Sequence, residues 1–200
     1  MVEGRRRLPK FKMRARQCTG MATAGRIIRL LGLRPHPEGG YFSEVWRSPE
    51  RLAVNALPPR YSGGRTLSTA IYYLITPEFF SRMHRLRSDE IFHFYMGDPV
   101  EMLLLAPRSA ARRFGAENSE GAGRKLIVGP DVEKGQRPLA VVRRGTWQGA
   151  RLKTKRKGAF ALMGTTMAPG FDEADFEEGK REALIREYPD FADAIRALTL

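Results

Sequence analysis

Residues 81–98, SRMHRLRSDEIFHFYMGD, contain two alternating strand patterns and the strongest candidates for polar chemistry in the chain. Alternation places Arg82, His84 and Leu86 on one face of the first strand. The second strand has a face formed by Glu90, Phe92, Phe94 and Met96. If the turn at 86–90 preserves this facing, His84 and Glu90 meet inside a barrel that is otherwise lined by aromatic residues. His93 has the opposite parity and points away unless a bulge intervenes.

Short strand patterns continue on both sides of this stretch. They cover residues 41–47, 67–76, 79–86, 90–96, 100–106, 110–114, 124–128, 139–143, 146–153 and 159–167. Turn residues every 8–12 positions predict a β-sandwich or barrel, and the missing helix-length connections exclude a βαβ fold. Helical spacing predicts a short N-terminal helix at 22–33 and C-terminal helices at 180–188 and 191–198, with Asp172 as an N-cap after Pro169. The predicted class is therefore all-β with short terminal helices.

Length and composition indicate one ordinary globular domain. The 200 residues are 42% hydrophobic and 28% charged, and we expect residues 22–200 to form a single domain behind a basic, disordered extension at 1–21. The longest apolar runs are far shorter than the roughly 20 residues needed to span a bilayer, so we expect a soluble protein with no membrane partner. Cys18 has no partner for a disulfide, which favours a reducing compartment, and we expect a cytoplasmic protein.

The formal net charge of +13 raises the alternative of a nucleic-acid partner. The first basic run lies in residues 1–20 and the second in residues 143–157. The first run is compatible with organellar targeting, a nucleic-acid-binding arm, a disordered extension, or a true start at Met21. The second is compatible with a solvated strand edge or a site for an anionic ligand. Neither run has the interleaved aromatic residues of a base-stacking surface.

The central stretch resembles the first motif of the cupin superfamily, the small jelly-roll barrels. Glu90 and Gly97 match its E-x6-G half, and His84-x-Leu86-x3-Glu90 matches its H-x-H-x3-E half with Leu86 in place of the second histidine. Gln148 stands where the second motif has a histidine. The resemblance implies a cupin jelly-roll barrel with these positions inside it.

A closer resemblance is to the cupin 5 branch, also called DUF985. It rests on HPEGGYF at 36–42, STAIYYL at 68–74, the stretch 84–98, GTWQGA at 145–150 and APGFDEADF at 168–176. All segments occur in order over residues 27–198. The branch implies no established substrate, and cupin barrels commonly pair, so the resemblance implies a homodimer. The segment 36–42 is either a lid or rim over the barrel mouth or a tight turn leading into the first strand.

Metal-dependent cupins typically hold a divalent transition metal with three histidines and one glutamate. Here His84 and Glu90 remain, Gln148 offers a weak carbonyl oxygen, and Leu86 offers no donor. We therefore expect no cofactor, with a divalent transition metal on His84, Glu90 and Gln148 as the alternative. Without a metal, His84 and Glu90 act as a catalytic acid–base pair, orient a polar ligand, or form a structural pair.

The leading hypothesis is a small polar ligand, sugar-like or nucleotide-like, in the barrel, with a metal-independent epimerase or isomerase reaction. Sugar-nucleotide epimerases on this barrel use a histidine base, which is an analogy from fold. The candidate ligand-binding residues are Gln148, Tyr72, Phe92, Phe94, Arg82, Trp147, Glu38 and Tyr41. The alternatives are a metal-dependent dioxygenase or isomerase, and a non-catalytic scaffold or basic nucleic-acid-binding protein that uses the N-terminal arm.

Overall fold

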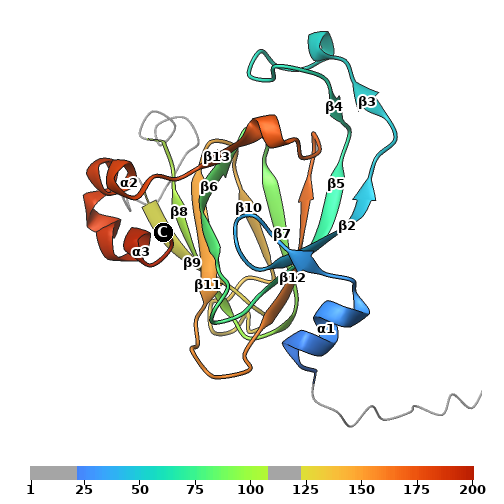
Figure 1. Ribbon diagram of the computed structural model, residues 1–200. Helices are drawn as coiled ribbons and strands as arrows, with labels where there is room; N and C mark the ends of the chain where they lie inside the picture. Colours follow the sequence, from blue (N-terminus) through green and yellow to red (C-terminus); the bar gives the residue numbers. More distant parts are fainter. Residues whose placement is uncertain (1–21, 108–122) are drawn as a thin grey trace, which may run out of the picture.

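Two β-sheets facing one another make up most of the molecule, with short helices outside them (Figure 1). The computed structural model describes residues 22–107 and 123–200. The predicted all-β class with terminal helices is confirmed. The predicted extension at 1–21 and the predicted strand at 110–114 lie outside the described residues.

The sheets have the non-sequential strand order of a jelly roll. In order across the larger sheet, the strands are β1 (Arg34–Pro35), β2 (Tyr41–Arg47), β5 (Thr69–Ile75), β12 (Ala161–Met167), β7 (Glu90–Gly97) and β10 (Leu139–Val142). Across the smaller sheet they are β13 (Phe176–Glu178), β6 (Ser81–Leu86), β11 (Trp147–Leu152), β8 (Val100–Leu105) and β9 (Gly123–Val128). The paired strands are antiparallel, and within the described residues no ladder joins the two sheets into a closed barrel.

A third, two-stranded sheet projects beyond the sandwich at the top of Figure 1. It consists of β3 (Arg51–Leu52) and β4 (Arg65–Thr66), joined through a 3₁₀ turn, η1 (Val54–Ala56). Residues 51–66 have no alternating pattern long enough to predict a strand, and these two-residue strands were not expected. Neither were β1 and β13, which are also shorter than the usual five or six residues.

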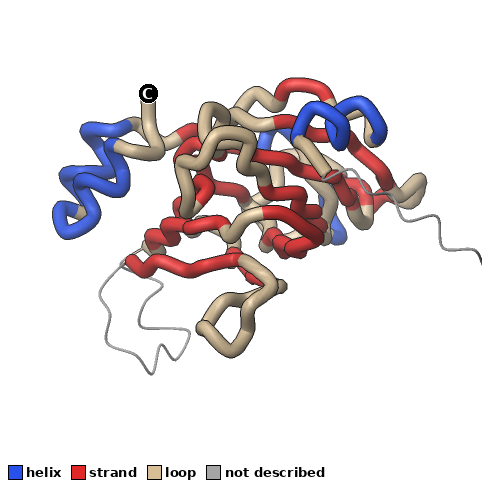
Figure 2. The backbone as a smooth tube through the Cα atoms, turned by 90° about the horizontal axis from the view of Figure 1, so that it is seen from below, coloured by secondary structure: helices blue, strands red, loops and turns tan. Residues whose placement is uncertain are grey.

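The helices pack against parts of the outer faces of both sheets (Figure 2). They are α1 (Ala24–Leu30), α2 (Arg181–Glu187) and α3 (Ala192–Arg196), with 3₁₀ turns η2 (Glu173–Asp175) and η3 (Pro189–Phe191). Thr23 caps α1 by accepting from the N–H of Arg26, and Gly32, with φ of 61°, ends it. Asp172 is an N-cap as predicted, but of η2 rather than of a full helix. No helix among the described residues is long and apolar enough to cross a membrane.

Alternation along the strands produces three apolar layers. The inner layer lies between the sheets and includes Ile75, Phe92, Met102 and Met163. The second lies under α2 and α3, and the third lies under α1. Because both faces of the larger sheet are partly covered, apolar residues occur at successive positions along β5 and β12.

One predicted facing is wrong, that of Met96. The pairing of β7 with β12 shifts between Phe94 and Met96, so Tyr95 is an extra residue on β7. Met96 then lies opposite Leu162, a residue of the outer layer, and is 38% exposed. The bulge breaks the alternation that otherwise holds along β7.

Candidate functional site

A cavity of about 420 Å³ lies between the two sheets, beside the inner apolar layer. Its apolar wall includes Phe42, Ile71, Leu86, Phe92, Met167 and Phe176. Its polar wall includes His36, Glu38, Tyr73, His84, Glu90 and Thr165. A mostly apolar cavity with a few convergent polar groups is the usual form of a small-molecule site.

His84 lies on β6 and is 3% exposed. Its Nδ1 is 2.8 Å from the carbonyl oxygen of Arg82, which can only accept, so this partner assigns the ring proton to Nδ1. In that tautomer Nε2 carries the free lone pair and is the basic atom of the ring. The ring of Phe176 stacks on the imidazole, with centroids 5.6 Å apart.

Glu90 reaches the same cavity from β7, in the opposite sheet. The amide nitrogen of Gln148 donates to Glu90 Oε2 at 2.7 Å. Gln148 pairs with His84 across β11 and β6, so all three side chains lie at one level of the sandwich. Gln148 itself does not line the cavity, and its own Oε1 is buried without a hydrogen-bond partner among the described residues.

The segment 36–40 forms one wall of the cavity and is fastened to β6. The N–H of Arg82 donates to the carbonyl of Glu38 at 3.0 Å, and the Arg82 guanidinium donates to the carbonyl of Pro37 at 2.6 Å. Gly39 has φ of 103°, and a Cβ there would collide with the carbonyl of Phe80, so only glycine fits. The segment is therefore a tight turn whose side chains also form a wall of the site. Arg82, predicted to touch ligand, holds this wall instead.

Glu38, on the segment 36–40, lies beside two histidines of the cavity. Its Oε2 is 3.2 Å from His84 Nδ1 and 4.0 Å from His36 Nδ1. The N–H of Glu38 donates to His36 Nδ1 at 3.2 Å, which places the proton of a neutral His36 on Nε2. His36 was quoted in the family motif but was not among the predicted site residues.

Burial shifts the pKa of the two histidines and of Glu38 and Glu90 toward their neutral forms. It lowers the pKa of His36 to about 4, assisted by nearby His84, and it lowers the pKa of His84 against the opposing effect of Glu90. It raises the pKa of Glu38 to about 8 although Arg82 opposes the shift. It also raises the pKa of Glu90, against the opposing effect of His84. At neutral pH the site therefore holds neutral imidazoles beside a protonated Glu38.

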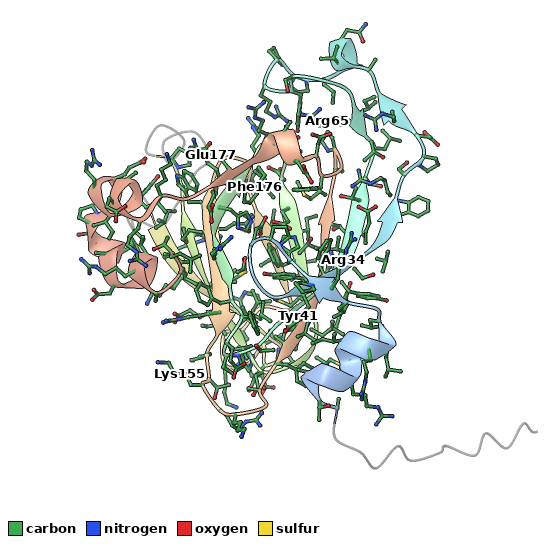
Figure 3. The ribbon with its side chains drawn as sticks, in the orientation of Figure 1. Arg34, Tyr41, Arg65, Lys155, Phe176 and Glu177 are labelled. Atoms are coloured by element: carbon green, nitrogen blue, oxygen red, sulfur yellow. The ribbon has the colours of Figure 1, made fainter. Side chains whose placement is uncertain are left out.

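The predicted aromatic contacts divide between the cavity and the packing layers. Phe92 lines the cavity, whereas Phe94 packs against the inner layer outside it. Tyr72 and Tyr41 face the layer under α1, and Figure 3 shows Tyr41 near that helix. The cavity takes Tyr73 instead, whose hydroxyl donates to the carbonyl of Gly39 at 2.8 Å. Alternation separates Tyr72 from Tyr73 but does not say which one faces inward.

Trp147 lies away from the cavity, among the apolar residues under α2 and α3. The guanidinium of Arg85 lies over its ring, 4.4 Å from the ring centroid. The structure therefore places Trp147 where it packs and where no molecule in the cavity reaches it. His93 also faces away from the cavity, and its Nε2 is 3.0 Å from Thr166 Oγ1.

The donor set does not fit a resident transition metal with the usual four cupin ligands. Leu86 brings no donor, and Gln148 directs its amide nitrogen toward Glu90. Nδ1 of His84 donates to a backbone carbonyl, so this ring offers one donor atom, Nε2. Over residues 22–107 and 123–200, no group of three or more His, Cys, Asp or Glu side chains is arranged to hold a metal ion.

The second basic run does not form one surface. Arg143 and Arg144 precede β11, whereas Lys153, Lys155 and Arg156 follow it. Figure 3 shows Lys155 at the bottom of the molecule, far from Phe176 and Glu177. Arg156 also pairs with Asp98 at 3.2 Å. The first run lies outside the described residues.

Comparison with known proteins agrees with this architecture. Residues 25–178 match the family model described as "Cupin superfamily (DUF985)". An uncharacterized protein of Saccharomyces cerevisiae is 29% identical over 157 residues, which are 74% of this chain and 71% of that protein. Among solved structures, a hypothetical protein from Leishmania major has 32% identity and a TM-score of 0.74, covering 89% of this chain and 99% of that one. A protein from Shewanella oneidensis has 29% identity and a TM-score of 0.73, with 90% and 99% covered.

Proposed function

Because the chain belongs to the DUF985 family of the cupin superfamily, we propose that its cavity binds a small polar molecule and that His84 and Glu90 transfer a proton on it without a metal. The observation that carries this proposal is the pairing of a neutral imidazole with a buried carboxyl across a mostly apolar cavity. Pairs of titratable groups whose uncharged forms are favoured by burial are typical of acid–base sites. The reaction class is epimerisation or isomerisation.

His84 acts as the base in this reaction. Its Nε2 removes a proton from a carbon next to a carbonyl group, and the proton becomes part of the imidazolium. The carbonyl oxygen of Arg82, 2.8 Å from Nδ1, stabilises the imidazolium that forms, and the carboxyl of Glu38 lies 3.2 Å from the same nitrogen. Glu38 is therefore a positioning residue that acts through His84.

Glu90 acts as the acid. Its raised pKa favours the protonated carboxyl, which donates to the carbonyl oxygen of the substrate as the enol forms. The Gln148 amide fixes its orientation from behind. Where the reacting carbon carries a hydroxyl group, the intermediate is an enediol: His84 returns its proton to the neighbouring carbon while the enediol hydroxyl returns a proton to Glu90, which gives the isomer. The epimer forms when the intermediate turns its other face to His84 before the proton returns to the same carbon and the enol hydroxyl returns its proton to Glu90.

The size and lining of the cavity favour a sugar-like or nucleoside-like ligand. About 420 Å³ is at the small end of the usual range for ligand sites. The aromatic side chains of Phe42, Phe92 and Phe176 offer flat apolar surface to a ring, and Thr165 and Tyr73 add hydroxyl groups. We also propose a cytoplasmic location, because the chain has one cysteine and so forms no disulfide within itself, which favours a reducing compartment.

The test is hydrogen exchange into a bound ligand. A thermal-shift screen of sugars, nucleosides and sugar nucleotides identifies ligands, and mass spectrometry in D₂O then detects solvent deuterium in them. We expect His84→Asn and Glu90→Gln to reduce exchange at least about 100-fold, the usual contribution of a general acid or base. His93→Asn is the matched control, because His93 lies on the outer face of the larger sheet.

Two results contradict the proposal. If His84→Asn and Glu90→Gln lower the melting temperature without changing ligand binding or exchange, the pair is structural. If the purified protein holds near-stoichiometric iron, manganese, nickel or zinc that His84→Asn removes, a metal-dependent dioxygenase or isomerase replaces the metal-free enzyme. Elemental analysis of protein prepared without chelators or metal-affinity resin makes this distinction.

A further inference from the structure

A second hollow, of about 480 Å³, lies on the other side of Leu86 and Phe176, the two residues that line both spaces. Four arginines line it: Arg60, Arg85, Arg87 and Arg144. They come from three separate segments, the connection between β3 and β4, the end of β6 with its following turn, and the turn before β11. The fold thus gathers four cations that the sequence keeps apart.

The carboxylates of this hollow are already paired. Glu177 accepts two hydrogen bonds from the Arg85 guanidinium, at 2.8 and 2.9 Å. Asp175 accepts two from the buried Arg65, at 2.8 and 2.7 Å. Figure 3 shows Glu177 and Arg65 at this upper end of the fold.

The other three arginines carry uncompensated positive charge. Within the described parts of the chain, no ion pair joins Arg60, Arg87 or Arg144 to a carboxylate, and the Arg144 side chain has no hydrogen-bond partner. Only the backbone N–H of Arg144 is engaged, by Asp89 Oδ1 at 2.7 Å.

Reciprocal hydrogen bonds hold two of these arginines side by side. Arg60 Nε donates to the carbonyl of Arg87 at 3.0 Å, and Arg87 Nη1 donates to the carbonyl of Arg60 at 2.9 Å. Arg60 also lies over the Tyr61 ring, 4.6 Å from its centroid. These bonds hold both guanidinium groups at the hollow, and an anion bound between them is attracted by both charges. The arrangement is therefore preorganised for an anion before one binds.

We propose that this hollow binds the phosphoryl group of a small phosphorylated molecule. Guanidinium groups present paired N–H donors that match the oxygens of a phosphate, and the three positive charges outweigh the two negative charges of a phosphate dianion. The cations converge on one concave point, whereas a nucleic acid requires an extended basic stripe with stacking aromatics. The site does not depend on the proposed proton transfer, because Leu86 and Phe176 separate it from His84.

Isothermal titration calorimetry of the full chain in about 150 mM salt, a physiological ionic strength, tests the proposal. The probes are inorganic phosphate, pyrophosphate, a hexose 1-phosphate and the unphosphorylated hexose. We expect the three phosphorylated probes to bind, and Arg144→Gln to weaken them at least about tenfold, the effect of losing one charge-assisted hydrogen bond. Arg29→Gln is the matched control, because it removes the same charge from the exposed helix α1. We expect it to change binding less than about twofold, because salt screens a distant charge.

The other outcomes show whether the ligand is a phosphorylated metabolite or free phosphate. They also show whether a nucleic acid binds instead. Tighter binding of the hexose 1-phosphate than of inorganic phosphate identifies a phosphorylated metabolite, and equal binding identifies free phosphate; both support the site. Equal weakening by Arg144→Gln and Arg29→Gln overturns it, because only the net charge then matters. Absence of binding by all phosphorylated probes, or far tighter binding of a short RNA duplex with a steep salt dependence, also overturns it. Unchanged melting temperatures show that both variants fold.

Discussion

Glu38 is the residue through which the charge of the site responds to pH. It lies on a turn rather than on a strand, yet it is nearly buried and touches His84. Its pKa is raised to about 8, whereas an ordinary glutamate titrates near 4.5. Burial is the main cause of the shift, and the carboxyl therefore keeps its proton at neutral pH.

This shift predicts a pH dependence of stability. Below pH 4.5 the carboxyl is protonated in both the folded and the unfolded chain. Between pH 4.5 and about 8 only the unfolded chain releases the proton, so the free energy of unfolding falls as pH rises, by at most about 5 kcal/mol. Glu38→Gln cannot titrate, and its stability relative to the wild type should increase steadily across this window. Urea denaturation at several pH values measures the difference.

Glu133→Gln is the control for this prediction, because Glu133 is exposed in the loop before β10. Its stability should follow the wild-type pH profile. His36 and His84 also contribute to the pH dependence of stability. Because both are present in all three proteins, their contributions cancel to first order when the profiles are compared. Parallel profiles for Glu38→Gln and the wild type would mean that Glu38 titrates normally.

At the scale of single residues, sequence patterns predicted the strand-borne half of the site. Alternation placed His84 and Glu90 toward the interior, and both line the cavity. It could not place His36 and Glu38, because a turn has no period and its side chains are aimed by Gly39 and by hydrogen bonds from β6. It also could not choose between Tyr72 and Tyr73, because α1 covers the outer face of β5 and both faces are therefore apolar.

At the scale of elements, the long strands were predictable and the short ones were not. The strand β2 matches its predicted range, residues 41–47. The strands β3, β4 and β13 have two or three residues, too few for a pattern to appear. They exist because tertiary contacts hold them, and the strongest of these contacts joins the β3–β4 sheet to the segment before β13.

That contact is the buried ion pair of Arg65 and Asp175, and it predicts a large loss of stability. Both side chains are at most 3% exposed, and two hydrogen bonds join them. Asp175→Asn leaves the Arg65 charge buried without a counter-ion, so we expect a loss of about 3–5 kcal/mol in the free energy of unfolding. Chemical denaturation at constant pH measures it.

Glu177→Gln provides the matched comparison, two positions along the chain. Glu177 also accepts two hydrogen bonds from an arginine, but its side chain is 55% exposed. Solvent screens this pair, so the expected loss is below about 1 kcal/mol. If the two variants lost equal stability, burial would not distinguish the pairs and the explanation of how β13 is held would fail.

At the scale of the whole molecule, the outer face of the larger sheet is unevenly covered. The helix α1 packs over Leu74 and Leu162, but the part formed by β7 and β10 stays open. There Tyr95, Leu139 and Val141 are between 43% and 51% exposed. The strand β10 ends the sheet, since it pairs with β7 alone among the named strands. An apolar face beside an unpaired edge is suited to a second sheet of the same kind.

We therefore propose that two copies of the chain pair through this face, in line with the homodimer that the family resemblance implies. Val141→Asp places a charge in the middle of the interface and should convert the dimer to a monomer in light scattering after gel filtration. Val132→Asp is the matched control, because Val132 is 56% exposed in the loop before β10 and lies outside the face. Both valines are exposed, so neither change should prevent folding. A wild-type protein that elutes as a monomer, or a dimer that survives Val141→Asp, would exclude this face, and the cavity would then have to function within a single chain.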